Sequence, residues 1–125
     1  MIRDGIDQRA DFLAFLDRLI EDVGDERTHR LLRAFTSETR RRMESIRALA
    51  GERNLTALRD ECHTLKGSAG SFGAVAVERQ AKAIVAACLT GDSAGALARV
   101  DELRGLVDAA LGALDKWLSG GTGRR

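Results

Sequence analysis

The sequence predicts an all-α protein, an antiparallel four-helix bundle with an additional short helix at its amino terminus. Proline is absent, aromatic residues make up only 4%, and Ala, Leu, Arg and Glu are abundant, a composition that favours helices over strands. Apolar residues recur at spacings of three and four along five segments, as in amphipathic helices. Short turns separate these segments, and helices joined in this way pack as antiparallel neighbours. With 125 residues, the chain is long enough for one domain with one core.

The first two helices are expected before residue 52. Asp7 or Asp11 starts a short first helix, which Gly24 ends. Its apolar face consists of Phe12, Phe15, Leu16, Leu19, Ile20 and Val23. Asp25 offers a cap for a long second helix, and Gly51 ends it. The core face of this second helix consists of Leu31, Leu32, Phe35, Thr39, Met43, Ile46 and Leu49.

Three further helices follow. Asn54 is a good cap for the third helix, and Gly73 marks its end. The fourth helix has an apolar face made of Val77, Ala81, Ile84, Val85, Cys88 and Leu89. It ends near Gly91, and Asp92 or Ser93 caps the fifth helix. The apolar face of the fifth helix consists of Leu97, Val100, Leu103, Val107, Ala110, Leu111, Leu114, Trp117 and Leu118.

These segments indicate one helical domain over residues 1–118, followed by a flexible polar tail over residues 119–125. The four helices of the bundle are expected over residues 25–50, 54–72, 74–90 and 93–118. The net charge is +1, with 20 basic and 19 acidic side chains, so no overall field favours nucleic acid or a membrane surface as a partner. The apolar runs are too short to span a bilayer and the amino terminus does not resemble a signal peptide, so a cytoplasmic protein is expected.

The third helix is predicted to expose a histidine. At about 100° per residue, one narrow stripe of this helix is apolar and is expected to be buried: Leu58, Cys62, Leu65, Ala69, Phe72 and Ala76. A second group lies about 130° from the centre of that stripe: His63, Lys66, Gly67, Gly70 and Ala74. Glycine within a helix costs about 0.5–1 kcal/mol relative to alanine. Because the two helical glycines lie beside the imidazole, they leave it open to a large partner, and the neighbouring lysine can neutralise a dianionic phosphoryl group.

Other residues invite alternative interpretations. His29 has no comparable neighbours and is expected to be a solvated or hydrogen-bonded side chain. The glycine-rich run over residues 67–73 lacks a preceding strand and a Gly-Lys-Ser/Thr ending, so it is not a nucleotide-binding loop. Cys62 and Cys88 lie on apolar stripes and are interpreted as buried reduced thiols, with a disulfide left open. The run Arg40-Arg41-Arg42 is interpreted as a solvated helix face, with contact to an acidic partner surface as the alternative.

The residues around the histidine resemble the histidine-containing phosphotransfer (HPt) domains of two-component phosphorelays. The resemblance is carried by the run Cys62-His63-Thr64-Leu65-Lys66-Gly67-Ser68-Ala69-Gly70, which continues into Phe72-Gly73-Ala74. It implies a phosphoryl carrier without its own ATP site, in which His63 accepts the phosphoryl group and Lys66 stabilises its charge. Gly67, Gly70 and Ala74 would then belong to the docking face for a partner.

The resemblance also implies the partners. These are aspartyl receiver domains of response regulators, which would supply the Mg²⁺ ion, and a hybrid histidine kinase; the chain itself would need no cofactor. The chain departs from the family pattern at Ile84 and Val85, where many members have Glu or Gln on the next helix. Gln80 is a substitute by type, but it falls a turn too early.

Two other classes of function compete with a phosphoryl carrier. One is a helical bundle that binds a receiver domain or another helical protein without chemistry. The other is a metal-binding or haem-binding bundle that uses His63, His29 and the two cysteines.

Overall fold

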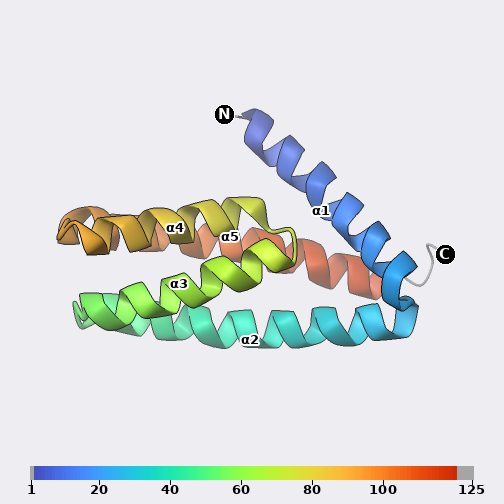
Figure 1. Cartoon of the computed structure of the whole chain (residues 1–125), viewed down its shortest axis with the longest axis horizontal. Coiled ribbons are helices and arrows are strands. Elements are labelled where there is room, and N and C mark those ends of the chain that lie inside the picture. Colours follow the sequence, from blue (N-terminus) through green and yellow to red (C-terminus); the bar gives the residue numbers. More distant parts are fainter. Residues whose placement is uncertain (1, 121–125) are drawn as a thin grey trace.

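The computed structural model describes the backbone of residues 2–120 and the side chains of residues 12–120. These residues form five α-helices and no strand, which confirms the all-α prediction (Figure 1). The helices are α1 (Ile2–Val23), α2 (Asp25–Gly51), α3 (Leu55–Ser71), α4 (Val75–Leu89) and α5 (Ser93–Gly120).

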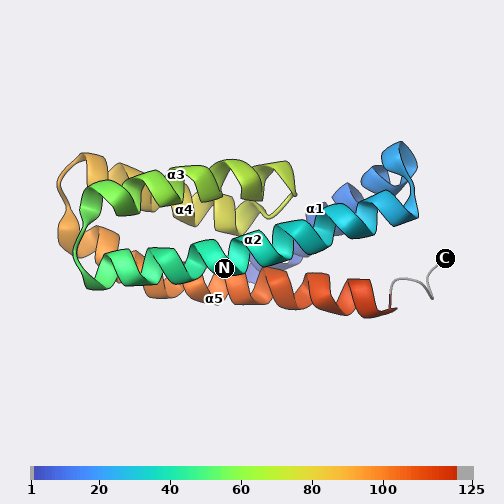
Figure 2. The same ribbon diagram turned by 90° about the horizontal axis from the view of Figure 1, so that it is seen from below.

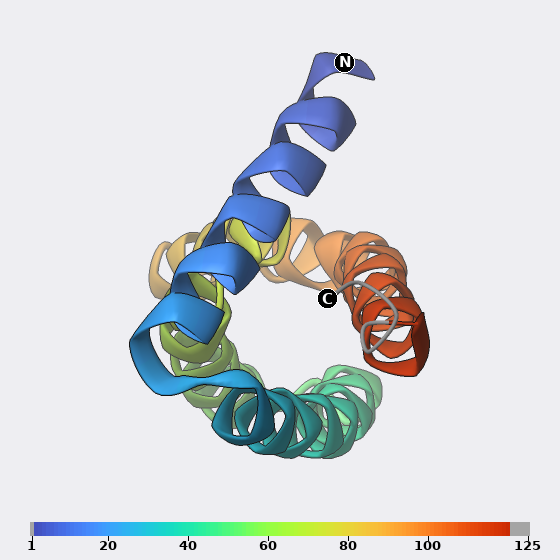
Figure 3. The same ribbon diagram turned by 90° about the vertical axis from the view of Figure 1, so that its right-hand side faces the viewer.

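Helices α2 to α5 form the bundle, and α1 crosses one of its ends. Figure 3, a view along the long axis, shows α2, α3, α4 and α5 arranged in a ring. The helices α3 and α4 form a short hairpin on the longer α2 and α5, which extend beyond it (Figure 2). The first helix runs obliquely across the end where α3 turns into α4, and it contacts α2 and α4. The exposed sides of α3 and α4 therefore lie on the surface of the bundle.

The core is built from aliphatic side chains of all four bundle helices. Its largest fully buried members from these helices are Leu32, Ile46, Leu58, Leu65, Ile84, Leu103 and Leu114. Burying one such side chain contributes about 1.5–3 kcal/mol, so the burial of this core determines which side of each helix faces inward.

Several helix ends follow the sequence predictions. Asn54 caps α3, because its side chain accepts a hydrogen bond from the Ala57 backbone N–H at 3.2 Å. Asp92 plays the same part for α5, where Oδ1 accepts from the Gly95 N–H at 2.9 Å. Gly73 follows α3 with a φ of 74°, a left-handed conformation that glycine adopts without strain.

The expected cap of α2 is wrong. Asp25 is the first residue of the helix, and Gly24 occupies the N-cap position with a φ of 87° and no side-chain cap. Asp25 and Glu26 lie in the first turn instead, where carboxylates interact favourably with the positive end of the helix dipole.

The first helix is longer than predicted. It has 22 residues and begins at Ile2, so Asp7 and Asp11 lie inside it and neither starts it. Phe12 and Leu16 are buried and hold the carboxyl-terminal half of α1 on the bundle. Once a helix is anchored in this way, each further residue adds a hydrogen bond at little cost, and no proline stops it.

Smaller differences occur on other helix faces. Leu31 and Leu89 are 40% and 65% exposed, although both were expected in the core. On α2, Thr28 and Thr36 are buried together with Leu32, so the inward stripe passes beside Leu31 and not through it. Leu89 is the last residue of α4, beyond the part covered by its neighbours. The fifth helix continues through Gly120, two residues past the expected boundary, and the rest of the tail lies outside the described residues.

Within the described part of the chain, none of the helices combines the length and the apolar character that crossing a lipid bilayer requires.

Candidate functional site

The third helix holds His63 on its exposed side. The opposite side is anchored in the core, because Leu58, Cys62, Leu65 and Ala69 are all fully buried. Phe72 and Ala76, which were expected on the same stripe, are half-buried, one at the end of α3 and the other in α4. With the helix fixed in this rotation, the imidazole faces solvent.

The residues around His63 differ in how open they are. Lys66 is partly buried, whereas Gly67 and Gly70 are exposed. A Cβ atom added at Gly67 would meet no atom within 4 Å, so the surface one turn after His63 is bare. A Cβ atom at Gly70 would lie 3.0 Å from Oε2 of Glu78 on α4. Gly70 therefore also allows a close approach of the α4 side chain, a packing role that helical spacing alone did not reveal.

Ala74 does not belong to this face. It is only 4% exposed and occupies the N-cap position of α4. The expectation failed because Gly73 reverses the chain, so the helical wheel of α3 does not extend to residue 74. A Cβ atom at Gly73 would lie 3.1 Å from Cβ of Phe15, and the Phe15 ring contacts Phe72 edge-on with centroids 6.0 Å apart. The turn is thus packed under α1.

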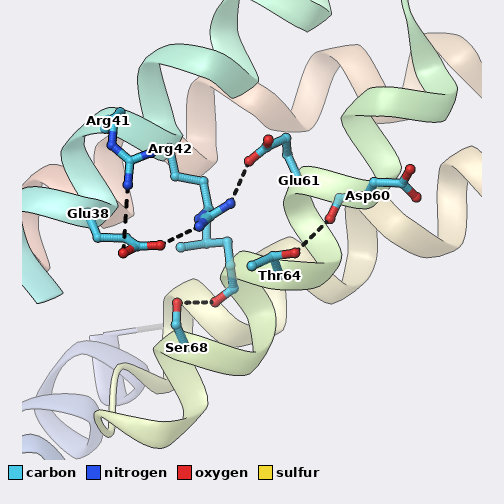
Figure 4. Close-up of polar contacts among 8 residues, drawn as sticks. Glu38, Arg41, Arg42, Asp60, Glu61, Thr64 and Ser68 are labelled. Carbon is cyan, nitrogen blue, oxygen red and sulfur yellow. Dashed lines mark hydrogen bonds and ion pairs between the residues drawn. The ribbon is translucent and has the colours of Figure 1, made fainter.

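A group of ion pairs holds α3 against α2, on the side of α3 that lies away from α4 (Figure 4). Arg42 is only 15% exposed, and it donates hydrogen bonds to Glu61 of α3 at 2.8 Å and to Glu38 on its own helix. Burial lowers the pKa of the Arg42 guanidinium, but the two carboxylates outweigh this effect and the pKa lies above its ordinary value. Glu61 lies two residues before His63, so this contact helps to set the rotation of α3.

Arg42 was expected on a solvated face together with Arg40 and Arg41. Arg41 does lie on the surface, where it pairs with Glu38 at 3.7 Å. The i,i+4 spacing of Glu38 and Arg42 in the sequence could have indicated that Arg42 forms an ion pair on its own helix. Nothing in the sequence indicates that Glu61 of α3 also pairs with Arg42.

The next helix, α4, forms no hydrogen bond with the side chain of His63. Gln80 is buried and donates to the Arg99 carbonyl at 3.1 Å and to Glu102 Oε1 at 3.2 Å, so its amide is engaged with α5. At the positions where the family pattern has Glu or Gln, Ile84 is buried and Val85 is half-buried. Among residues 12–120, no side-chain hydrogen bond reaches His63.

The contacts of His29 and the state of the two cysteines agree with structural roles for these residues. His29 Nδ1 lies 2.8 Å from the Asp25 carbonyl, and its ring packs on Trp117 with centroids 5.1 Å apart, in agreement with the interpretation as a hydrogen-bonded side chain. Cys62 and Cys88 are free thiols. Burial raises the pKa of Cys62 to about 12 and also raises that of Cys88. Within the described residues, no three His, Cys, Asp or Glu side chains are grouped to hold a metal ion.

In a comparison with known families, the chain matches the model of the Hpt domain over residues 30–116. No curated protein and no solved structure matches the chain.

Proposed function

Since the matched region spans more than half of the chain, the protein belongs to the Hpt family, which carries out histidine phosphotransfer in two-component signalling; on this premise we propose that it carries a phosphoryl group on His63 between aspartyl receiver domains. The observation that carries the proposal is the exposure of this imidazole. The chain has two histidines, and His63 is the one inside the matched region. His29 lies outside it and uses one ring nitrogen on a backbone carbonyl.

The transfer step needs an accessible nitrogen lone pair. A neutral imidazole has one, and an exposed side chain can present it to the phosphorus atom opposite the leaving group. A new P–N bond to His63 forms while the P–O bond of the receiver's aspartyl phosphate breaks, and the aspartate leaves as a carboxylate. The reverse step returns the phosphoryl group to the same receiver or to another one.

The neighbours of His63 support this step in two ways. Lys66 follows His63 by one helical turn, so its ammonium can neutralise charge on the phosphoryl group. The bare surface at Gly67 leaves room for the partner. The carboxylate and the Mg²⁺ ion of the reaction would come from the receiver domain, so this chain contributes the imidazole and the cation.

The shuttle is tested with two receivers. One receiver is phosphorylated, freed of its donor and mixed with this protein, and the second, unphosphorylated receiver is then added. We expect label to pass through this chain and to reach the second receiver much faster than without it, and His63→Gln to abolish both steps. Binding of the receivers without any label on this chain would contradict the proposal and would favour an interaction bundle.

A further inference from the structure

The contact between Gly70 and Glu78 sets the register of α3 against α4. The two helices run antiparallel and lie side by side in both perpendicular views (Figures 1 and 2). Position 70 of α3 faces position 78 of α4, where a Cβ atom would approach the carboxylate to 3.0 Å.

Helical spacing extends this register along the seam. Residues four and seven positions apart share one face of a helix. Counting back from Gly70, that face of α3 carries Lys66 and then His63. Counting forward from Glu78, the facing side of α4 carries Lys82 and then Val85. Because the helices are antiparallel, this register puts position 66 opposite position 82, and position 63 opposite position 85.

Lysines therefore occupy facing positions of the two helices, and each position is one turn from the pair of positions 63 and 85. Lys82 is exposed and Lys66 is partly buried. Among residues 12–120, neither lysine forms an ion pair. Two like charges that face each other repel, and a dianion placed between them would remove that repulsion. Two lysines at facing positions, neither in an ion pair and with the Glu78 carboxylate one turn away, are thus a suitable arrangement for a phosphoryl group on the neighbouring ring.

We propose that Lys82 of α4 is a second cation of the phosphoryl site, acting with Lys66 on the group carried by His63. This role rests on the proposed function, because Lys82 can act in this way only if His63 is phosphorylated. It also gives α4 a part in the site that does not depend on a Glu or Gln at Ile84 or Val85. The ammonium attracts the phosphoryl oxygens as the P–N bond forms, while the aspartyl carboxylate, or ammonia from a small donor, leaves with the electrons of the broken bond.

The test uses phosphoramidate, a small donor that phosphorylates imidazole directly and needs no docking surface. The rate of labelling is compared for the wild type, Lys82→Ala, Lys82→Arg and Lys82→Glu, with Lys116→Ala, an exposed lysine on α5, as the matched control. We expect Lys82→Ala to slow labelling about two- to fivefold and Lys82→Glu to slow it further, while Lys82→Arg and Lys116→Ala stay near the wild type.

Salt separates an electrostatic role from a structural one. At 1 M salt the screening length falls to about 3 Å, so the difference between the wild type and Lys82→Ala should shrink. Equal rates for Lys82→Ala and Lys116→Ala, or a loss in Lys82→Ala that salt does not change, would overturn the role of Lys82. If instead His63→Gln is labelled as fast as the wild type, the proposed function itself fails, so the two failures are distinguishable.

Discussion

The guanidinium of Arg42 on α2 and the carboxylate of Glu61 on α3 form a hydrogen-bonded ion pair of 2.8 Å, two residues before the exposed histidine. The pair is mostly shielded from water, because the two side chains are 15% and 30% exposed. It lies on one flank of α3, and the seam with α4 lies on the other. The rotation of α3, and with it the direction of His63, is therefore held from both sides as well as by the core.

Replacing Arg42 tests how much the ion pair between Arg42 and Glu61 contributes to the free energy of unfolding. Arg42→Met keeps a long helix-forming side chain but leaves Glu61 partly buried without its partner, so we expect the free energy of unfolding to fall by about 1–2 kcal/mol. The control is Arg40→Met, because Arg40 pairs with Asp115 at 2.7 Å in a half-exposed position and should cost at most about 1 kcal/mol. Urea unfolding measures both, and equal losses would show that the contact between α2 and α3 has no special weight.

Glycine at position 67 is expected to favour docking of the receiver and not the stability of the fold. Because nothing lies within 4 Å of an added Cβ atom at Gly67 or at Gly105 of α5, alanine at either site should raise the free energy of unfolding by about 0.5–1 kcal/mol. Gly67→Leu should slow transfer from a phosphorylated receiver by about ten- to a hundredfold, since a misplaced partner loses its alignment. Its labelling by phosphoramidate should stay normal. Receiver transfer at the wild-type rate would refute the docking role, and Gly105→Leu serves as the control.

Lys66 should affect the reaction more than the fold. Lys66→Ala removes a charge one turn from His63, so we expect transfer from a receiver to slow about two- to fivefold. The unfolding free energy should change by less than about 1 kcal/mol, the cost of losing the packed stem of a surface lysine. Quenched time courses of transfer and urea unfolding on the same samples separate the effect on the transfer rate from the effect on stability. An unchanged rate in Lys66→Ala, or a slow rate in Lys66→Arg, would contradict a role of its charge.

The buried thiol of Cys62 makes stability depend on alkaline pH. Burial is the main cause that raises its pKa to about 12 from an ordinary value of 9.0, with smaller effects of Cys88 and Glu61. Above pH 9 the unfolded chain releases this proton while the folded chain keeps it, so the stability present below pH 9 is lost as the pH rises toward 12. Between pH 7 and pH 10 this group should remove on the order of 1 kcal/mol.

The measurement is urea unfolding at both pH values for the wild type and Cys62→Ala. The contributions of lysines and arginines are common to both proteins, so they cancel in the difference between the two pH dependences. Cys62→Ala is expected to start from a lower stability, because it leaves a small cavity, and to lose less on going to pH 10. Parallel pH dependences would show that the thiol titrates normally in the folded protein.

The sequence predicted the features that depend on helical periodicity and on local caps. The buried stripe from Leu58 to Ala69 follows from the repeat of 3.6 residues, because a helix in a bundle can bury only one side. The cap at Asn54 follows from the chemistry of one side chain and the N–H group three residues later. Since the position of His63 depends on this stripe, its exposure could be predicted without coordinates.

Features that depend on a second helix could not be predicted in this way. Ala74 lies just past a turn, so the wheel of α3 assigned it to the wrong surface. The burial of Arg42 depends on Glu61, and the close fit at Gly70 depends on Glu78; both partners come from neighbouring helices whose register is set by tertiary packing. The start of α1 was missed for another reason, because an anchored helix continues past a favourable cap residue when nothing stops it.

Whether His63 carries the phosphoryl group is tested most directly by locating this group after transfer from a phosphorylated receiver. The labelled protein is digested under alkaline conditions, which preserve a phosphoramidate bond, and the peptides are sequenced by mass spectrometry. We expect an acid-labile phosphoryl group on His63, normal labelling of His29→Gln and none of His63→Gln. Undiminished labelling of His63→Gln, or a phosphoryl group found on another residue, would contradict this expectation.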